Sequence, residues 1–109
     1  MELPIIWNDD VNKIEGHLDE DAHWKRPDLA PGTAAWCKGD DGQIATLNFV
    51  CPCGCTEVGT VPVRPGFGGA HWGWDGNITS PTLMPSILRC RPQSCGWHGY
   101  VTKGKFVTC

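Results

Sequence analysis

The cysteine pattern constrains the fold of this chain more than any other feature of its sequence. Three thiols stand within residues 51–55 (CPCGC), and Cys95 and His98 follow as a Cys-x-x-His pair. Zinc ions in proteins are held by cysteine and histidine ligands grouped in short segments of this kind. The fold must therefore bring two distant segments together around one metal ion, which we expect to be Zn²⁺.

A structural zinc ion takes four ligands, and the sequence offers more than four. Neighbouring ligands in an extended strand, at positions i and i+2, would lie about 6.6 Å apart, whereas two zinc-bound sulfurs lie roughly 4 Å apart. Residues 51–55 must therefore curl, and Pro52 and Gly54 suit such a bend. Cys37 is expected to be a buried free thiol. Four ligands are expected from Cys51, Cys53, Cys55, Cys95 and His98, with Cys90 and Cys109 in reserve.

Metal ligation explains the thiols better than a disulfide framework does. Seven cysteines cannot all pair within one chain. Residues 1–4 have neither the basic start nor the apolar stretch of a signal peptide, and no apolar run approaches the roughly 20 residues of a membrane span. We therefore expect a cytoplasmic protein with reduced cysteines.

The backbone composition favours short strands over helices. The chain contains 14 glycines and 9 prolines, which leave little room for long helices. Apolar residues alternate along 43–50 with period two, as in a half-buried strand. We predict a single, mostly β domain of short antiparallel strands over residues 43–109. An acidic N-terminal arm, residues 1–42, is expected to be loop-rich or partly helical over 9–22. Further strands are expected at 34–37, 57–63, 82–88 (interrupted by Pro85) and in a terminal hairpin over 99–108.

Three motifs resemble a known family over residues 43–109. They are CPCGC at 51–55, PTLMPSI at 81–87 and CGWHGYV at 95–101 with a following glycine. They are similar to those of small phage and bacterial proteins classed as a domain of unknown function. Some members carry the label ammonia monooxygenase, but a thiolate-rich site suits zinc better than an oxygen-activating metal. The resemblance implies a phage or prophage origin, and some relatives lie beside bacterial ubiquitin-like conjugation genes.

A structural zinc leads us to expect a non-catalytic binding or adaptor module that acts on a host or phage protein. Tryptophan is abundant, with six residues, and its indole either fills a small core or anchors a partner. The candidate binding surface comprises Trp72, Trp74, Trp97, Arg89 and Arg91.

Two other functions are possible from the sequence. A zinc-dependent hydrolase would need an open metal position, with His71, Asp75 or His98 nearby. A nucleic-acid-binding module would use the basic C-terminal residues. The sequence contains no Ser-His-Asp order and no His-Glu-x-x-His motif to support an enzyme. The basic residues are Arg89, Arg91, Lys103 and Lys105.

Overall fold

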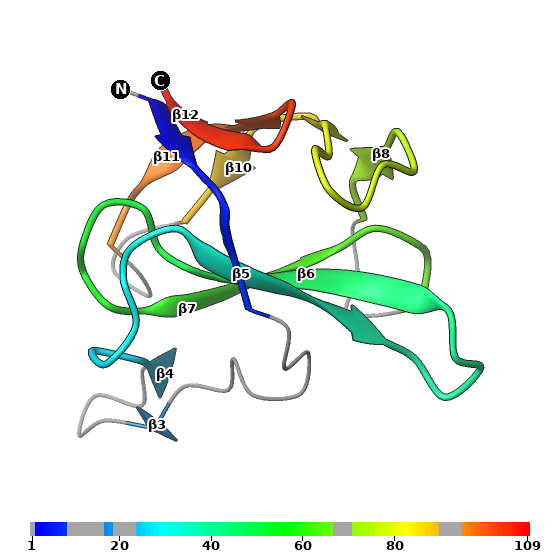
Figure 1. Cartoon of the computed structure of the whole chain (residues 1–109), viewed down its shortest axis with the longest axis horizontal. Coiled ribbons are helices and arrows are strands. Elements are labelled where there is room, and N and C mark those ends of the chain that lie inside the picture. The colour runs from blue at the N-terminus through cyan, green and yellow to red at the C-terminus, as the bar shows by residue number, and fades with distance from the viewer. Residues whose placement is uncertain (1, 9–16, 19–23, 67–70, 90–94) are drawn as a thin grey trace.

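Two four-stranded β-sheets pack face to face in this protein (Figure 1). The computed structural model describes residues 2–8, 17–18, 24–66, 71–89 and 95–109. All regular elements in these ranges are strands, so the prediction of a mostly β domain is confirmed. Within the same ranges, no helix is long and apolar enough to cross a membrane.

The first sheet has the order β2-β5-β6-β7. Its strands are β2 (Ile6–Trp7), β5 (Thr33–Lys38), β6 (Ile44–Val50) and β7 (Val58–Pro62). The period-two pattern of β6 places Ala45, Leu47 and Phe49 in the core, each at most 2% exposed. β6 and β7 match strands expected from the sequence and pair antiparallel, with the cysteine-rich loop 51–55 between them.

The second sheet has the order β1-β12-β11-β10. Its strands are β1 (Glu2–Pro4), β10 (Ile87–Leu88), β11 (His98–Thr102) and β12 (Lys105–Thr108). The β11–β12 hairpin turns at Lys103 and Gly104, whose φ angles are 48° and 77°. Two consecutive positive φ values are the signature of a type I′ turn, the tight connection that matches strand twist. This is the terminal hairpin that the sequence predicts.

The N-terminal residues belong to both sheets. β1 pairs with β12 in one sheet, and β2 pairs in parallel with β5 in the other. The segment thus passes from one layer to the next at Ile5 (Figure 1). The helix expected over 9–22 lies largely outside the described residues, although His17–Leu18 within that range form β3. β3 pairs with β4 (Trp24–Lys25).

Pro85 divides the predicted strand 82–88 into two short ones. β9 (Leu83–Met84) pairs with β8 (Gly73–Trp74), and β10 joins the sheet of β11. Proline lacks the N–H that a continuous ladder requires. The chain therefore changes partner strand at Pro85, and Ser86 lies at this change of direction.

Aromatic side chains fill the space between the sheets. The ring centroids of Phe49 and Phe106 lie 5.2 Å apart, and that of Trp97 lies 6.4 Å from Phe49 and 6.0 Å from Phe106. The Trp97 indole N–H donates to Thr108 Oγ1 at 3.1 Å. Trp97 is only 6% exposed and so belongs to the core rather than to a binding surface. Trp72 and Trp74 are half-buried.

Candidate metal centre and nucleophile

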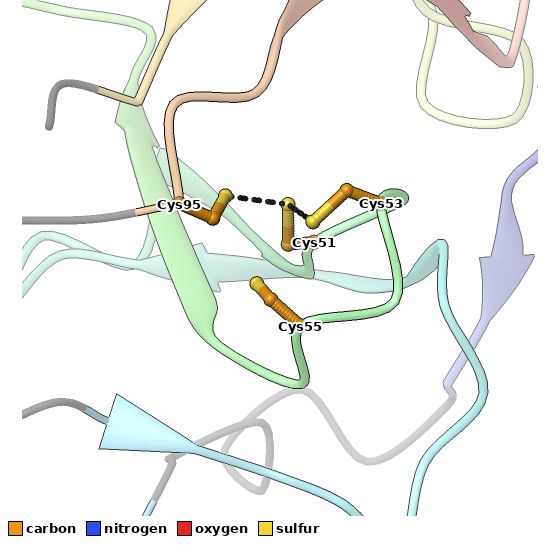
Figure 2. Close-up of side chains that lie close together, drawn as sticks. All are labelled: Cys51, Cys53, Cys55 and Cys95. Carbon is orange, nitrogen blue, oxygen red and sulfur yellow. Dashed lines mark hydrogen bonds between the residues drawn. The ribbon is translucent and has the colours of Figure 1, made fainter.

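Four cysteine side chains point toward one another (Figure 2). Cys51, Cys53 and Cys55 come from the loop between β6 and β7, and Cys95 comes from the segment that leads into β11. Cys51 is fully buried, Cys55 and Cys95 are half-buried, and Cys53 is exposed. The structure thus brings together the two distant segments that the sequence predicts to meet.

The spacing of the four sulfur atoms suits a tetrahedral ion. Cys51 Sγ lies 3.3 Å from Cys53 Sγ and 3.4 Å from Cys95 Sγ. All four sulfurs lie within 4.8 Å of one another. Sulfurs bound at about 2.3 Å to one tetrahedral zinc are about 3.8 Å apart, so only small shifts would complete the geometry. The donor set fits a metal ion, and thiolate donors favour zinc among the common ions.

Backbone N–H groups also converge on the sulfurs. The N–H of Cys53 donates to Cys51, the N–H of Glu57 to Cys55, and the N–H of Trp97 to Cys95. Each donor lies two residues after its thiol. Such outer-shell donors orient metal ligands and stabilise their negative charge.

Left-handed backbone conformations produce the turns beside the four cysteines. Gly54, Thr56 and Gly96 each follow a cysteine of the cluster and have φ angles of 91°, 69° and 80°. Glycine adopts such angles without a steric penalty, and Thr56 is the exception. The curl expected from Pro52 and Gly54 is therefore present, and it aims three sulfurs at one point.

Cys51, Cys55 and Cys95 have very different proton affinities. Burial raises the pKa of Cys51 far above its usual range and raises the pKa of Cys55 to about 12. Burial acts in the same direction on Cys95, but hydrogen bonds from the Trp97 N–H and from the neighbouring thiols outweigh it and lower its pKa to about 7. Of these three thiols in the metal-free cluster, Cys95 therefore ionises first, and a bound metal ion would displace the remaining protons.

Alkylation of the metal-free, reduced protein should reveal the order in which these thiols ionise. Because the thiolate is the reactive form, iodoacetamide at about pH 7 should modify Cys95 about tenfold or more faster than Cys55, which is also half-buried. Modification of Cys95 should slow as the pH falls below about 7. Peptide mapping by mass spectrometry measures the rates. Equal rates at Cys95 and Cys55 would contradict the order, and added Zn²⁺ should protect all four cysteines.

The remaining ligand candidates lie elsewhere. His98 is exposed on β11 and is not a member of the cysteine cluster. Cys37 is half-buried on β5 rather than fully buried, and Cys109 is exposed after β12. Cys90 and Arg91 lie outside the described residues.

The residues proposed for an open zinc site have other positions. His71 is exposed. Asp75 Oδ1 accepts the backbone N–H groups of Asn77 and Thr82 at 3.0 and 3.3 Å, so it shapes the loop before β9. Neither residue is part of the four-cysteine cluster.

His98 instead meets a serine. Its Nε2 atom lies 2.9 Å from Ser86 Oγ. The register of the β10–β11 pair explains the contact, because Leu88 lies opposite His98 and Ile87 opposite Gly99. Side chains alternate along a strand, so His98 reaches Ser86 diagonally on the outer face of the sheet. A serine hydroxyl within hydrogen-bond reach of an imidazole is the arrangement of an activated nucleophile.

Rigid neighbours hold both members of this pair. The Ser86 carbonyl accepts the Trp72 indole N–H at 3.2 Å, and the His98 carbonyl accepts the Cys109 N–H at 3.0 Å. Gly99 follows His98, and a Cβ there would lie 2.5 Å from the Trp97 ring and from the Val107 carbonyl. β11 can therefore pack this closely only with glycine beside the histidine.

A buried ion pair lies between the cysteine loop and the end of β10. Arg89 Nη2 lies 3.2 Å from Glu57 Oε2, and both side chains are largely buried. The Arg89 guanidinium also lies 5.8 Å from the Phe49 ring centroid. Arg89 is thus a structural residue in a paired, enclosed position rather than part of an exposed basic surface.

Sequence comparison supplies the family. The sequence model described as "Bacterial ubiquitination-like system serine protease (BubE)" matches residues 20–109. The chain belongs to this family. The BubE match includes every cysteine of the cluster together with Ser86 and His98. No curated protein and no solved structure gives a significant match.

Proposed function

We propose that this BubE-family chain is a serine peptidase of a bacterial ubiquitination-like system, with Ser86 as nucleophile and His98 as general base. The observation that supports this proposal most directly is the 2.9 Å distance between Ser86 Oγ and His98 Nε2. The family description, which names a serine protease, supports the same chemistry.

The pair suits acyl transfer. With the imidazole proton on Nδ1, Nε2 accepts the hydroxyl hydrogen of Ser86 as Oγ attacks the substrate carbonyl. The protonated His98 then donates that proton to the leaving amine, and an acyl-serine ester remains. Water attacks the ester, again with His98 as the base, and releases the acid and the free serine. His98 is exposed and Ser86 is partly exposed, so a polypeptide substrate can reach both.

We assign a structural role to the metal and expect it to be zinc, held by Cys51, Cys53, Cys55 and Cys95. Four sulfur ligands would fill a tetrahedral sphere and leave no position for a water or a substrate. The bound ion would supply folding energy and join the β6–β7 loop to the start of β11. A zinc-dependent hydrolase is less favoured, because it would need an open metal position.

A protein substrate is the partner we expect for the peptidase. This replaces the non-catalytic adaptor favoured by the sequence alone, since an adaptor gives no reason for the Ser86–His98 contact. Nucleic-acid binding receives little support, because Arg89 is paired with Glu57 and Lys105 lies 3.7 Å from Glu2. A cytoplasmic location and a phage origin stay predictions.

A fluorophosphonate probe tests this proposal directly. Such probes phosphonylate an activated serine Oγ, and fluoride leaves. We expect one adduct, mapped to Ser86, that disappears in Ser86→Ala and weakens strongly in His98→Gln. Ser80→Ala removes an exposed serine outside the pair and should still label. An adduct elsewhere, or none in the folded protein, would overturn the assignment.

A further inference from the structure

Exposed apolar side chains flank Ser86 and His98 along the chain. Among the described residues, five large apolar side chains are exposed, and three of them lie two positions from one member of the pair. They are Met84 (67% exposed), Leu88 (57%) and Tyr100 (43%). Clustered apolar exposure of this kind marks a binding surface more often than isolated residues do.

Leu88 and Tyr100 lie on the same outer face of the sheet as His98. Leu88 lies opposite His98 in the β10–β11 register. Tyr100 is two residues beyond His98, with buried Gly99 between them, so strand alternation places both on the outer face. A polypeptide segment presented to Ser86 Oγ would therefore also contact apolar surface.

A cavity of about 240 Å³ continues this surface at the edge of the sheet. Its volume is below the about 300–1,000 Å³ of pockets that hold whole drug-sized ligands, which suits a single side chain. The cavity lies next to the proposed nucleophile, because Trp72 lines it and the Trp72 indole N–H donates to the Ser86 carbonyl at 3.2 Å. The lining includes Phe49, Val61, Trp72, Ile87, Leu88 and Arg89.

The charge of the cavity favours a neutral occupant. Arg89 is the one charged residue among the described residues that line it, and its guanidinium is 3.2 Å from the Glu57 carboxylate. This pairing offsets the positive charge, so an acidic side chain would gain little there. The other named lining residues present apolar surface, on which burial of an apolar side chain contributes about 25 cal/mol per Å².

We infer that the substrate is an extended polypeptide with a large apolar side chain next to the scissile bond, and that the surface of Leu88 and Tyr100 together with the adjoining cavity selects it. This inference rests on the serine peptidase proposed above. It adds the substrate class and identifies Leu88 as a specificity-determining residue, because Leu88 belongs to both the surface and the cavity lining.

A defined peptide mixture with sequencing of the cleavage sites by mass spectrometry tests the preference. We expect Leu, Ile, Phe or Met to be strongly enriched at one position next to the cleaved bond. Cleavage without any apolar enrichment would overturn the inference, as would an enrichment of acidic or basic residues. Hydrolysis of p-nitrophenyl acetate without cleavage of any peptide would also overturn it.

Two variants assign the preference to this surface. Leu88→Asp should lower kcat/KM for the best library peptide about tenfold or more, and this loss should exceed the loss for p-nitrophenyl acetate. Thr60→Phe, at an exposed position of the cavity lining, should do the same by filling the space. Ile6→Asp changes an exposed apolar residue on β2, in the other sheet, and should retain the wild-type peptide rate.

Hydrolysis of p-nitrophenyl acetate distinguishes a failure of the substrate assignment from a failure of the proposed peptidase function. If p-nitrophenyl acetate is hydrolysed through Ser86 but Leu88→Asp and Thr60→Phe cleave peptides at the wild-type rate, only the substrate assignment fails. If neither ester nor peptide reacts and Ser86 takes no fluorophosphonate, the proposed peptidase itself fails. Circular dichroism confirms that each variant is folded before it is assayed.

Discussion

Ser86→Ala should reduce kcat/KM for both peptide and ester substrates by about 10³-fold or more. The expected loss is large because, in the proposed mechanism, the hydroxyl forms the covalent intermediate. Removing one member of such a catalytic pair abolishes most of the rate enhancement that the pair provides. His98→Gln should cause a loss of similar size, since the amide cannot take the proton at the 2.9 Å contact. The double variant should be little worse than either single variant, because the two groups act together.

Matched substitutions distinguish this mechanism from the alternatives. Ser80→Ala and His71→Gln change an exposed serine and an exposed histidine outside the pair and should retain activity. A loss in His71→Gln with full activity in Ser86→Ala would instead favour a metal-activated water. Thermal denaturation should show similar stability for all four single variants, since the altered side chains are at least partly exposed.

Removal of the metal ion should unfold the protein or bring it close to unfolding. A core between two small sheets is marginal, and a structural zinc site supplies folding energy outright. We expect Cys51→Ser to lower the free energy of unfolding by more than about 4 kcal/mol, because Cys51 is fully buried within the cluster. The corresponding fall in Tm is roughly 15 °C or more.

The measurements are the zinc content and the Tm before and after treatment with a chelator. Cys109→Ser alters an exposed cysteine outside the cluster and should keep both the metal and the stability. Cobalt substitution should give the spectrum of a closed, sulfur-rich tetrahedral site. An unchanged melting curve after complete metal removal would contradict the structural role.

Local patterns in the sequence were enough to predict much of the fold. Alternation along residues 43–50 correctly predicted a half-buried strand, and Ala45, Leu47 and Phe49 of β6 form its buried face. Pro85 correctly marked a break between strands. The N-terminal strands were not predicted, because β1 and β2 are only 3 and 2 residues long and too short to display a period.

The spacing of Cys95 and His98 suggested a shared metal ligand role, but strand geometry separates their side chains. Cys95 precedes the left-handed turn at Gly96 and joins the cysteine cluster, whereas His98 faces outward on β11. A Cys-x-x-His pair converges on one ion in a tight turn, but here β11 begins at His98. The chain is therefore already extended at the second candidate ligand.

The Ser86–His98 contact could not be predicted from spacing, because it depends on register. Both residues fall within recognised motifs, at 81–87 and 95–101. Their approach requires the pairing of Leu88 with His98, and a shift of one residue would turn one side chain to the opposite face. The sequence carries no local signal for that pairing.

The alternation of side chains along β11 also determines which substitutions this protein can tolerate without loss of stability. Trp97, Gly99 and Val101 are buried between the sheets, whereas His98 and Tyr100 lie outside. One strand thus separates positions that keep the chain folded from positions that would meet a substrate of the proposed peptidase. Substitutions at Tyr100, and at Leu88 on the neighbouring strand, can alter what is cleaved while the packing beneath them stays intact. Cleavage preference can therefore diversify with little cost in stability.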